Sequence, residues 1–320
     1  MSKLFIRRFV VIIFLFSLSN CSENSNGKTQ ELLKSYTYDF VEVDHGKIFY
    51  KKFGSGSPII FLHGGPGLVD HTFFLPQMLE LAKDHELIFY DQRGSGKSLT
   101  TDLTEQYINV KKFTEDLELL RKKLGYDKFT IIGHSWGGFL ALNYAIDYPG
   151  RLNKIILLNT GPCDEKGYKK FGESFVETTK PIKDKISPLF SYDEFKSLNS
   201  YQLVDLYKTI FSVYFYDSKE LNHLTFNIDE SYSRSGFRVG EMMMPKIFKE
   251  NFTIFPQLNK LNIPTLLIHG DSDIIPYSVA EEIKDNIPGA KIVKLEKSGH
   301  VSYIENPDET FGAIREFMAE

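Results

Sequence analysis

Ser135 is the residue of this 320-residue chain whose surroundings most clearly indicate chemistry. It lies in the pentapeptide 133–137, Gly-His-Ser-Trp-Gly, which follows the apolar run 129–132 and precedes a helix-like segment at 139–144. A strand, a sharp turn and a helix in this order lift a serine hydroxyl above the edge of a sheet. Glycine is needed at both ends of the pentapeptide because a Cβ there would collide with the crowded turn. The pattern therefore predicts a nucleophilic serine.

Two later segments of the chain supply the base and the acid that such a serine requires. A serine hydroxyl is a poor nucleophile at neutral pH, so a histidine must take its proton and a carboxylate must fix the tautomer of that histidine. His300 follows the last expected strand, and both Asp271 and Asp273 follow the strand before it. The order serine, aspartate, histidine accompanies a serine on this kind of turn. We therefore predict a triad of Ser135, His300 and one of the two aspartates.

The negative charge that develops on an attacked carbonyl oxygen must be met by backbone N–H groups. Trp136, the residue after the nucleophile, is expected to supply one of them. The segment 63–67, His-Gly-Gly-Pro-Gly, follows the expected strand 58–62. Its glycines let the backbone approach a substrate closely, and we predict that Gly65 is the second donor.

The segment 94–98, Gly-Ser-Gly-Lys-Ser, looks like the end of a phosphate-binding loop but does not complete the pattern. The full motif requires glycine five residues before Gly96, and that position is Asp91. The formal net charge of −4 also argues against nucleic acid as a partner. We therefore expect neither nucleotide nor nucleic-acid binding.

Strand-like and helix-like segments alternate along most of the chain after an opening hairpin at 38–53. This alternation predicts an α/β fold with a mostly parallel, twisted sheet and helices on both faces. Residues 161–257 interrupt it, because they are rich in aromatic residues at helical rather than strand spacing. They predict a helical cap inserted between two strands, over the sheet edge where ligands bind. The predicted core then comprises residues 37–160 and 258–320.

The first twenty residues predict a signal peptide, with three basic residues before the apolar run 9–18. That run is shorter than the roughly 20 residues that span a bilayer. Cys21 follows in a context similar to the lipobox of bacterial lipoproteins, in which the cysteine becomes the lipidated first residue. The resemblance implies an exported bacterial protein, anchored in the cell envelope or periplasm to a membrane through Cys21, with residues 21–36 as a flexible tether. Ordinary secretion as a soluble protein, with cleavage after Ser19, is the alternative.

Three motifs stand together in this sequence: His-Gly-Gly-Pro-Gly at 63, Asp-Gln-Arg-Gly-Ser-Gly-Lys-Ser at 91 and Gly-His-Ser-Trp-Gly-Gly at 133. The set resembles the proline iminopeptidases and related prolyl aminopeptidases of the α/β-hydrolase superfamily, in which a tryptophan after the nucleophile is characteristic. The resemblance covers about residues 38–318 and implies the α/β-hydrolase fold. It further implies release of an N-terminal proline, or a similar small residue, from short peptides through an acyl-enzyme, with no metal and no organic cofactor. Asp273 matches the family's G-x-x-D segment, so the resemblance favours it over Asp271.

The substrate of such an enzyme depends on the cap. The family holds the free α-amino group of its substrate with acidic residues, mainly from the cap, and this cap offers Glu220, Asp229, Glu230 and Glu241. If no carboxylate faces Ser135, a carboxylesterase, a lipase-like hydrolase or an amidase acting on uncharged acyl groups is the better interpretation. A non-catalytic binding protein on the same fold is a third hypothesis, against which the complete set of serine, aspartate and histidine argues.

Overall fold

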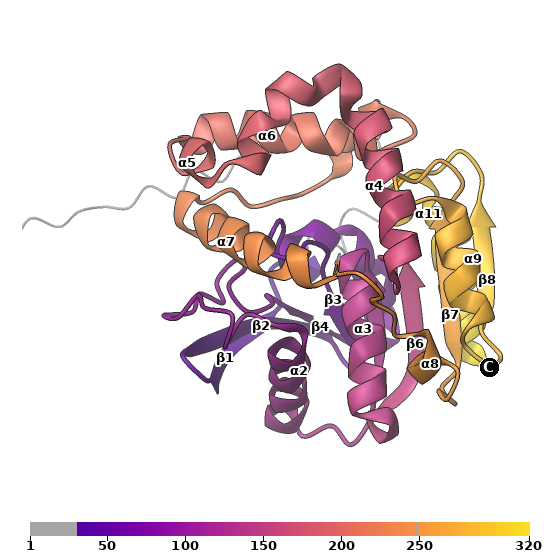
Figure 1. Cartoon of the computed structure of the whole chain (residues 1–320). Coiled ribbons are helices and arrows are strands. Elements are labelled where there is room, and N and C mark those ends of the chain that lie inside the picture. Colours follow the sequence, from indigo (N-terminus) through magenta and orange to yellow (C-terminus); the bar gives the residue numbers. More distant parts are fainter. Residues whose placement is uncertain (1–30, 248) are drawn as a thin grey trace, which may run out of the picture.

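An eight-stranded sheet forms the centre of the protein in the computed structural model, which describes residues 31–247 and 249–320 (Figure 1). The strands are β1 Thr37–Val43, β2 Gly46–Gly54, β3 Ser57–Leu62, β4 His85–Tyr90, β5 Phe129–His134, β6 Leu152–Leu158, β7 Thr265–Gly270 and β8 Lys291–Leu295. Their order is β1-β2-β4-β3-β5-β6-β7-β8. β2 pairs antiparallel with β1 and β4, and the other neighbours are parallel. The predicted α/β fold is therefore confirmed.

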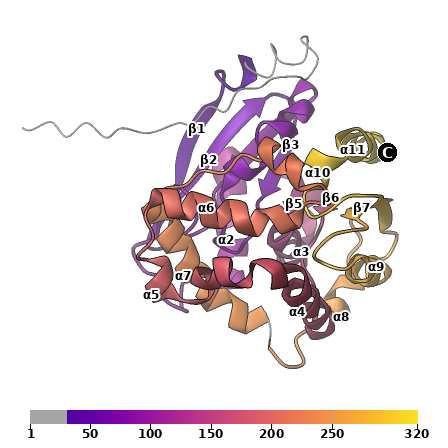
Figure 2. The same ribbon diagram turned by 90° about the horizontal axis from the view of Figure 1, so that it is seen from above.

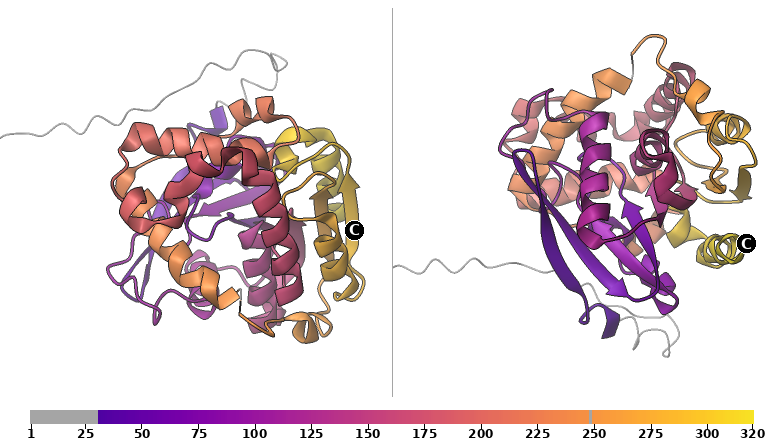
Figure 3. Two further views of the ribbon diagram at one scale, coloured as in Figure 1. Left: turned by 45° about the horizontal axis from the view of Figure 1, so that its top comes forward. Right: turned by 90° about the horizontal axis from the view of Figure 1, so that it is seen from below.

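Alternate side chains of each strand enter two separate apolar layers, as the two-residue period of a strand requires. In β3, Ile60 and Leu62 belong to one layer, and Ile59 and Phe61 belong to the other. The first layer is covered by α2 Val110–Leu124, α3 Trp136–Asp147 and α9 Tyr277–Asp285. The second is covered by the short 3₁₀ helices His71–Phe74 and Gln77–Lys83 and by α10 Ser302–Glu305 and α11 Pro307–Ala319. Figure 3 shows this arrangement from two further sides.

The described residues between β6 and β7 form the helices of a cap. These are α4 Glu165–Thr179, α5 Tyr192–Phe195, α6 Ser200–Phe211 and α7 Glu230–Ile247, with short 3₁₀ helices between them. The short helix α8 Phe255–Leu258 follows the cap and packs against the first apolar layer. The N–H of Glu165 donates to the carbonyl of Phe252 at 2.8 Å, and the N–H of Ile254 donates to that of Cys163 at 3.0 Å. The chain thus enters and leaves the cap at one place. Figures 1 and 2 show α4 to α7 lying over one edge of the sheet.

The predicted signal peptide and Cys21 lie outside the described residues. Of the predicted tether, residues 31–36 are described, and they contact the core: Leu32 and Leu33 pack against the second apolar layer. The ring of Tyr36 lies 5.6 Å from that of Phe53. Within residues 31–247 and 249–320, none of the helices is both long and apolar enough to cross a membrane.

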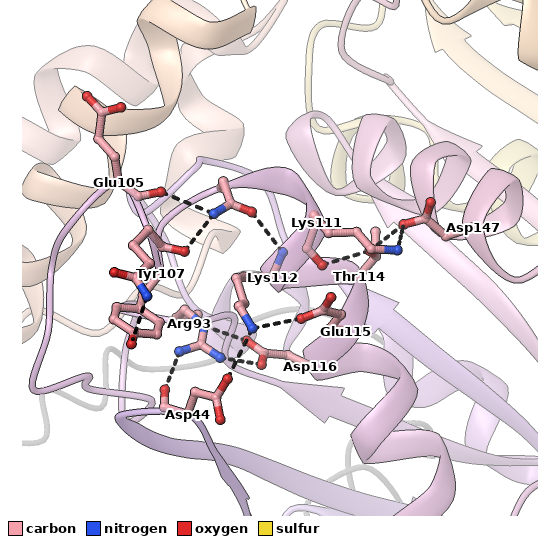
Figure 4. A network of polar contacts seen from close by, with 12 residues as sticks. Asp44, Arg93, Glu105, Tyr107, Lys111, Lys112, Thr114, Glu115, Asp116 and Asp147 are labelled. Atoms are coloured by element: carbon pink, nitrogen blue, oxygen red, sulfur yellow. Dashed lines mark hydrogen bonds and ion pairs between the residues drawn. The ribbon is translucent and has the colours of Figure 1, made fainter.

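The loop after β4 is held by a buried ion pair. The guanidinium of Arg93, which is 2% exposed, donates to both carboxylate oxygens of Asp116 at 2.8 and 2.5 Å, and to the carbonyl of Asp44 at 2.6 Å (Figure 4). The loop also closes on itself, because the N–H of Gly94 donates to the carbonyl of Ser98 at 2.8 Å. These contacts fix the start of the segment that resembles a phosphate-binding loop.

Candidate active site

Ser135 occupies the turn between β5 and α3 in a backbone conformation that residues other than glycine rarely adopt. Its φ is 54° and its ψ is −122°. The N–H of Ser135 donates to the carbonyl of Leu158 at 3.0 Å, and its carbonyl accepts from the N–H of Gly161 at 2.8 Å. A Cβ at Gly137 would collide with the carbonyl of Leu62. Tight contacts with neighbouring strands therefore hold the strained turn that presents the serine.

Asp273, rather than Asp271, lies against His300. The Nδ1 of His300 donates to the carboxylate of Asp273 at 2.8 Å, and both side chains are almost completely buried. Asp271 is exposed and accepts instead from Ser272 Oγ at 2.9 Å and, over 3.4 Å, from the N–H of Ser298. Because Nδ1 of His300 carries the proton in this contact, Nε2 is left as the basic nitrogen of the ring.

The carboxylate of Asp273 is surrounded by hydrogen-bond donors. It accepts from the N–H of Ile275 at 2.9 Å and from Nδ2 of Asn159 at 2.8 Å, and Nε2 of His269 lies 3.2 Å away. Burial alone would raise the pKa of Asp273, but the neighbouring imidazoles of His300 and His269 and the hydrogen bonds from His300 and from the N–H of Ile275 lower it below the ordinary value. The acid is therefore ionised and can orient His300.

Asn159 was not singled out by the sequence. It is fully buried directly after β6, with a φ of 47°, and its Nδ2 also donates to the carbonyl of Gly299 at 3.0 Å. One amide thus joins the acid to the turn that carries His300. Its position at the carboxyl end of a strand was the only local signal of this role.

His134, immediately before the nucleophile, connects the serine turn to His300. Its Nε2 donates to the carbonyl of His300 at 2.7 Å, and the two rings are 4.8 Å apart. Burial and the neighbouring His300 lower the pKa of His134 to about 3, so the ring is neutral. Among the described residues, the predicted hydrogen bond between the Ser135 hydroxyl and Nε2 of His300 is not formed, and without substrate such catalytic contacts are often long and tighten only when substrate binds.

The segment 63–67 lies against Ser135, as an oxyanion loop must. A Cβ built on Gly64 would be 3.3 Å from the Cβ of Ser135. Gly65 has a φ of 132°, which an L side chain rarely adopts. Within the described part of the chain, the N–H groups of Gly65 and Trp136 have no hydrogen-bond acceptor. Two N–H groups without acceptors, one in the residue after the nucleophile and one in the loop that lies against it, are of the kind that can stabilise an oxyanion.

Gln92 joins all three motifs through hydrogen bonds. Its Nε2 donates to the carbonyl of His63 at 2.6 Å, and its N–H donates to Nε2 of His63 at 3.0 Å. Its Oε1 accepts from the indole Nε1 of Trp136 at 2.8 Å. Gln92, His63 and Trp136 are at most 3% exposed. The loop that carries Gly65 and the side chain of Trp136 are therefore tied to the same amide.

The four acidic cap residues proposed from the sequence all have partners within the cap. Glu241 pairs with Arg238 at 2.6 Å, and Glu220 lies 3.8 Å from His223. The two acids at the start of α7 are likewise engaged: Asp229 accepts from the N–H of Ser231 at 2.9 Å, and Glu230 accepts from the N–H of Ser200 at 3.0 Å and from Arg234 at 2.9 Å. None of these contacts involves Ser135 or His300.

Among residues 31–247 and 249–320, one group of side chains could offer ligand atoms to a metal ion. Asp70, His71 and Asp91 are buried, and one potential ligand atom from each lies within 4.8 Å of the others. The carboxylate of Asp91, however, already accepts from the N–H and Nδ1 of His71, at 2.9 and 2.6 Å, and from the N–H of Lys97 at 2.8 Å. These contacts fit a hydrogen-bonded aspartate and histidine pair better than an open set of ligands.

The fold and this arrangement define a hydrolase of the α/β class. Residues 57–307 match the family described as alpha/beta hydrolase fold, so the chain belongs to this family. It is similar to the proline iminopeptidase of Heyndrickxia coagulans, at 28% identity over 300 residues that cover 88% of this chain and 99% of that protein. It is also similar to the proline iminopeptidase of Saccharolobus solfataricus, at 29% identity over 290 residues that cover 85% of this chain and 88% of that protein.

Solved structures share the fold at lower identity. An α/β fold family hydrolase from Bacillus anthracis str. Sterne superposes with a TM-score of 0.69 at 20% identity, covering 88% of this chain and 99% of that one. The esterase RhEst1 from Rhodococcus sp. ECU1013 superposes with a TM-score of 0.67 at 20% identity, covering 89% of this chain and 99% of that one. At such identity the likeness supports the fold alone.

Proposed function

We propose that this protein is a serine hydrolase that acts through an acyl-enzyme and releases proline, or a similar small residue, from the N-terminus of peptides. The observation that carries the proposal is the buried hydrogen bond of 2.8 Å between Asp273 and His300, whose carbonyl accepts from His134, the residue next to a serine on a strained turn. The similarity to two proline iminopeptidases over most of the chain supports the choice of substrate class.

In the proposed reaction, Nε2 of His300 takes the hydroxyl proton of Ser135 while the serine oxygen bonds to the substrate carbonyl carbon. The N–H groups of Gly65 and Trp136 hold the resulting oxyanion. The carbon–nitrogen bond then breaks as His300 gives its proton to the leaving amine, which leaves the acyl group on Ser135. Water repeats the sequence in the second half of the reaction, and the free amino acid leaves. Asp273 stabilises His300 whenever the ring is protonated.

A hydrolase of uncharged acyl groups, such as a carboxylesterase, is the second candidate. The observation that favours it is that Glu220, Asp229, Glu230 and Glu241 are each engaged by other cap residues. An aminopeptidase needs at least one carboxylate for the α-ammonium group of its substrate, because an unpaired buried charge is costly.

Two measurements test these candidates. A fluorophosphonate probe should label Ser135, and absence of labelling would revive the hypothesis of a non-catalytic binding protein. Turnover of proline β-naphthylamide should then exceed that of its N-acetylated form, which lacks the charged amine. Turnover of p-nitrophenyl acetate without any turnover of the amide would favour the esterase instead.

We also propose that the protein is exported and anchored to a membrane by a lipid on Cys21, which rests on the sequence of the first 21 residues. Mass spectrometry of the mature N-terminus tests this proposal. A lipidated cysteine at the first position is expected, and a chain that begins at Asn20 would indicate ordinary secretion.

A further inference from the structure

The turn that carries His300 is fastened by a carboxylate that lies outside the triad. Glu305 ends the short helix α10, and its Oε2 accepts from the N–H of Gly299 at 2.6 Å. Gly299 immediately precedes His300, and its carbonyl accepts from Asn159. The peptide groups on both sides of Gly299 are therefore held by side chains.

The same carboxylate also holds a segment of the cap. Oε1 of Glu305 accepts from the N–H of Tyr216 at 2.6 Å and from that of Asp217 at 3.2 Å. These residues belong to the connection between α6 and α7, far from Glu305 in the sequence. Three N–H donors converge on one carboxylate, and bonds of this kind to a charged acceptor are stronger than neutral ones.

The cap segment held by Glu305 touches His300 directly. The N–H of His300 donates to the carbonyl of Tyr214 at 2.6 Å, and the ring of Tyr214 meets the imidazole edge to face at 5.1 Å. A Cβ at Gly299 would lie 2.9 Å from the nitrogen of Tyr216 and would also collide with the carbonyl of Tyr214. Only glycine therefore allows this close approach of cap and turn.

Within the described part of the chain, Glu305 has no cationic partner that would explain its position. Among residues 31–247 and 249–320, no lysine, arginine or histidine forms an ion pair with it. Burial is the main reason that the pKa of Glu305 is raised, with a further contribution from Glu220, although the three N–H groups oppose the shift. A partly buried carboxylate satisfied only by backbone N–H groups is suited to ordering loops.

We propose that Glu305 is a positioning residue of the hydrolase: by binding the N–H groups of Gly299, Tyr216 and Asp217 together, it fixes His300 between the cap and the acid. The proposal rests on the proposed function, since it assigns a role in activating Ser135. It makes the cap a part of the catalytic machinery as well as a cover for the substrate.

The test compares Glu305→Gln with Glu309→Gln, which changes an exposed carboxylate of α11 that has no hydrogen bond to any of the residues that the structure describes. The glutamine keeps the size of the side chain but presents an NH₂ group to at least one N–H donor. We expect the second-order rate constant for fluorophosphonate labelling of Ser135 to fall about 10- to 100-fold in Glu305→Gln, as for small displacements of reacting groups. The midpoint of the pH profile of labelling should also move in Glu305→Gln. Glu309→Gln should match the wild type in both the rate constant and this midpoint.

The outcomes separate this proposal from the proposed function. If the wild type itself is not labelled, the assignment as a serine hydrolase fails. If the wild type is labelled and folded Glu305→Gln is labelled at the same rate with the same pH profile, the positioning role is overturned. A purely structural role would lower the melting temperature without moving the pH profile of the folded enzyme. Should Glu305→Gln not fold, Glu305→Asp decides in its place, because it keeps the charge but shortens the side chain that binds three N–H groups. A loss of labelling in Glu305→Asp supports the positioning role, and unchanged labelling with an unchanged pH profile overturns it.

Discussion

The indole Nε1 of Trp136 donates a hydrogen bond of 2.8 Å to the side-chain oxygen of Gln92. The same amide donates to the carbonyl of His63 at 2.6 Å, so it connects the helix that follows the nucleophile to the oxyanion loop. The backbone N–H groups that would bind the oxyanion belong to Trp136 itself and to Gly65, two residues after His63. We therefore expect the distance between the two N–H groups to depend on Gln92, whose hydrogen bonds among the described residues go to His63 and Trp136 and not to Ser135.

Replacing Gln92 with methionine should separate the two oxyanion donors without unfolding the protein. The substitution keeps an unbranched side chain of similar length but leaves the indole N–H and the carbonyl of His63 without partners. We expect kcat/KM to fall about 10- to 100-fold. Trp136 is the only tryptophan of the chain, so the tryptophan fluorescence of the protein reports on this residue alone. Its emission should change when the indole loses its hydrogen bond to Gln92. The exposed Gln106→Met is the control and should alter neither quantity; unchanged activity in Gln92→Met would refute the role of Gln92.

Ser135→Ala should abolish turnover and labelling while the fold remains. Removal of the nucleophile from a catalytic triad costs on the order of 10⁴-fold or more in rate. The residue is in a strained conformation for any side chain, so alanine is tolerated as well as serine. Circular dichroism and turnover of the preferred substrate test this prediction, with the exposed Ser272→Ala as the control. Appreciable turnover by the alanine variant would mean that the nucleophile lies elsewhere.

The two aspartates after β7 should differ sharply in their effect on activity. Asp273→Asn removes the charge that accepts from Nδ1 of His300 and favours the wrong tautomer of the ring, so kcat should fall about 10⁴-fold. Asp271→Asn should reduce kcat less than about threefold, because that side chain is exposed and its carboxylate only caps a loop. A larger loss of kcat in Asp271→Asn than in Asp273→Asn would reverse the assignment.

The parts of the site that could be predicted from the sequence are those with a local pattern. The strand, turn and helix around Ser135 form a continuous segment, and the glycines of 133–137 mark the turn. The choice between Asp271 and Asp273 depended on a resemblance, and the structure shows the physical reason, since the two side chains of one loop point to different surroundings. The alternation of strand-like and helix-like segments along the chain likewise predicted a sheet covered on both faces, which the two apolar layers confirm.

The residues that the sequence missed act through contacts between distant segments. Asn159 meets Asp273 across 114 positions, and Gln92 meets Trp136 across 44. No local pattern specifies such pairs, because they arise only when parallel strands align their carboxyl ends.

Two of the acidic cap residues, in contrast, form ion pairs with residues close to them in the sequence. Glu230 with Arg234 and Glu241 with Arg238 are pairs at helical spacing, so their engagement within α7 could have been predicted once that helix was assumed.

His134 should make the protein sensitive to acid. Its pKa is about 3 in the folded protein and about 6.5 when exposed, so between these values the unfolded chain binds a proton that the folded chain does not. Stability is therefore lost as the pH falls through this range, by up to about 1.4 kcal/mol per pH unit. His134→Gln cannot titrate but can still donate to the carbonyl of His300. Urea unfolding at a series of pH values should show that the free energy of unfolding of His134→Gln falls less steeply below about pH 6. The wild type and the exposed control His223→Gln should both show the steeper fall. Equal slopes in all three proteins would contradict the prediction.

The buried pair of Arg93 and Asp116 should contribute far more to stability than a surface pair. Both carboxylate oxygens are bound by one guanidinium, and the two side chains are 2% and 3% exposed (Figure 4). Arg93→Met leaves Asp116 buried without a cation and should cost about 3–5 kcal/mol. Arg151→Met, which breaks an exposed pair with Asp127, should cost less than about 1 kcal/mol. Burial already raises the pKa of Asp116 to about 6.

Without Arg93 the carboxyl of Asp116 should take up a proton more readily, so its pKa in the folded protein should be raised further. A carboxyl whose pKa is raised on folding makes the folded protein less stable as the pH increases. The cost of Arg93→Met should therefore be larger at about pH 8 than at about pH 6. Adding Asp116→Leu removes the unpaired charge and should recover much of the loss and abolish this dependence on pH. Guanidinium unfolding of the single and double variants measures both effects. If Arg93→Met were no more destabilising than Arg151→Met, the pair of Arg93 and Asp116 would not be what holds the loop after β4. Another contact would then have to fix the position of Gln92, the residue before Arg93.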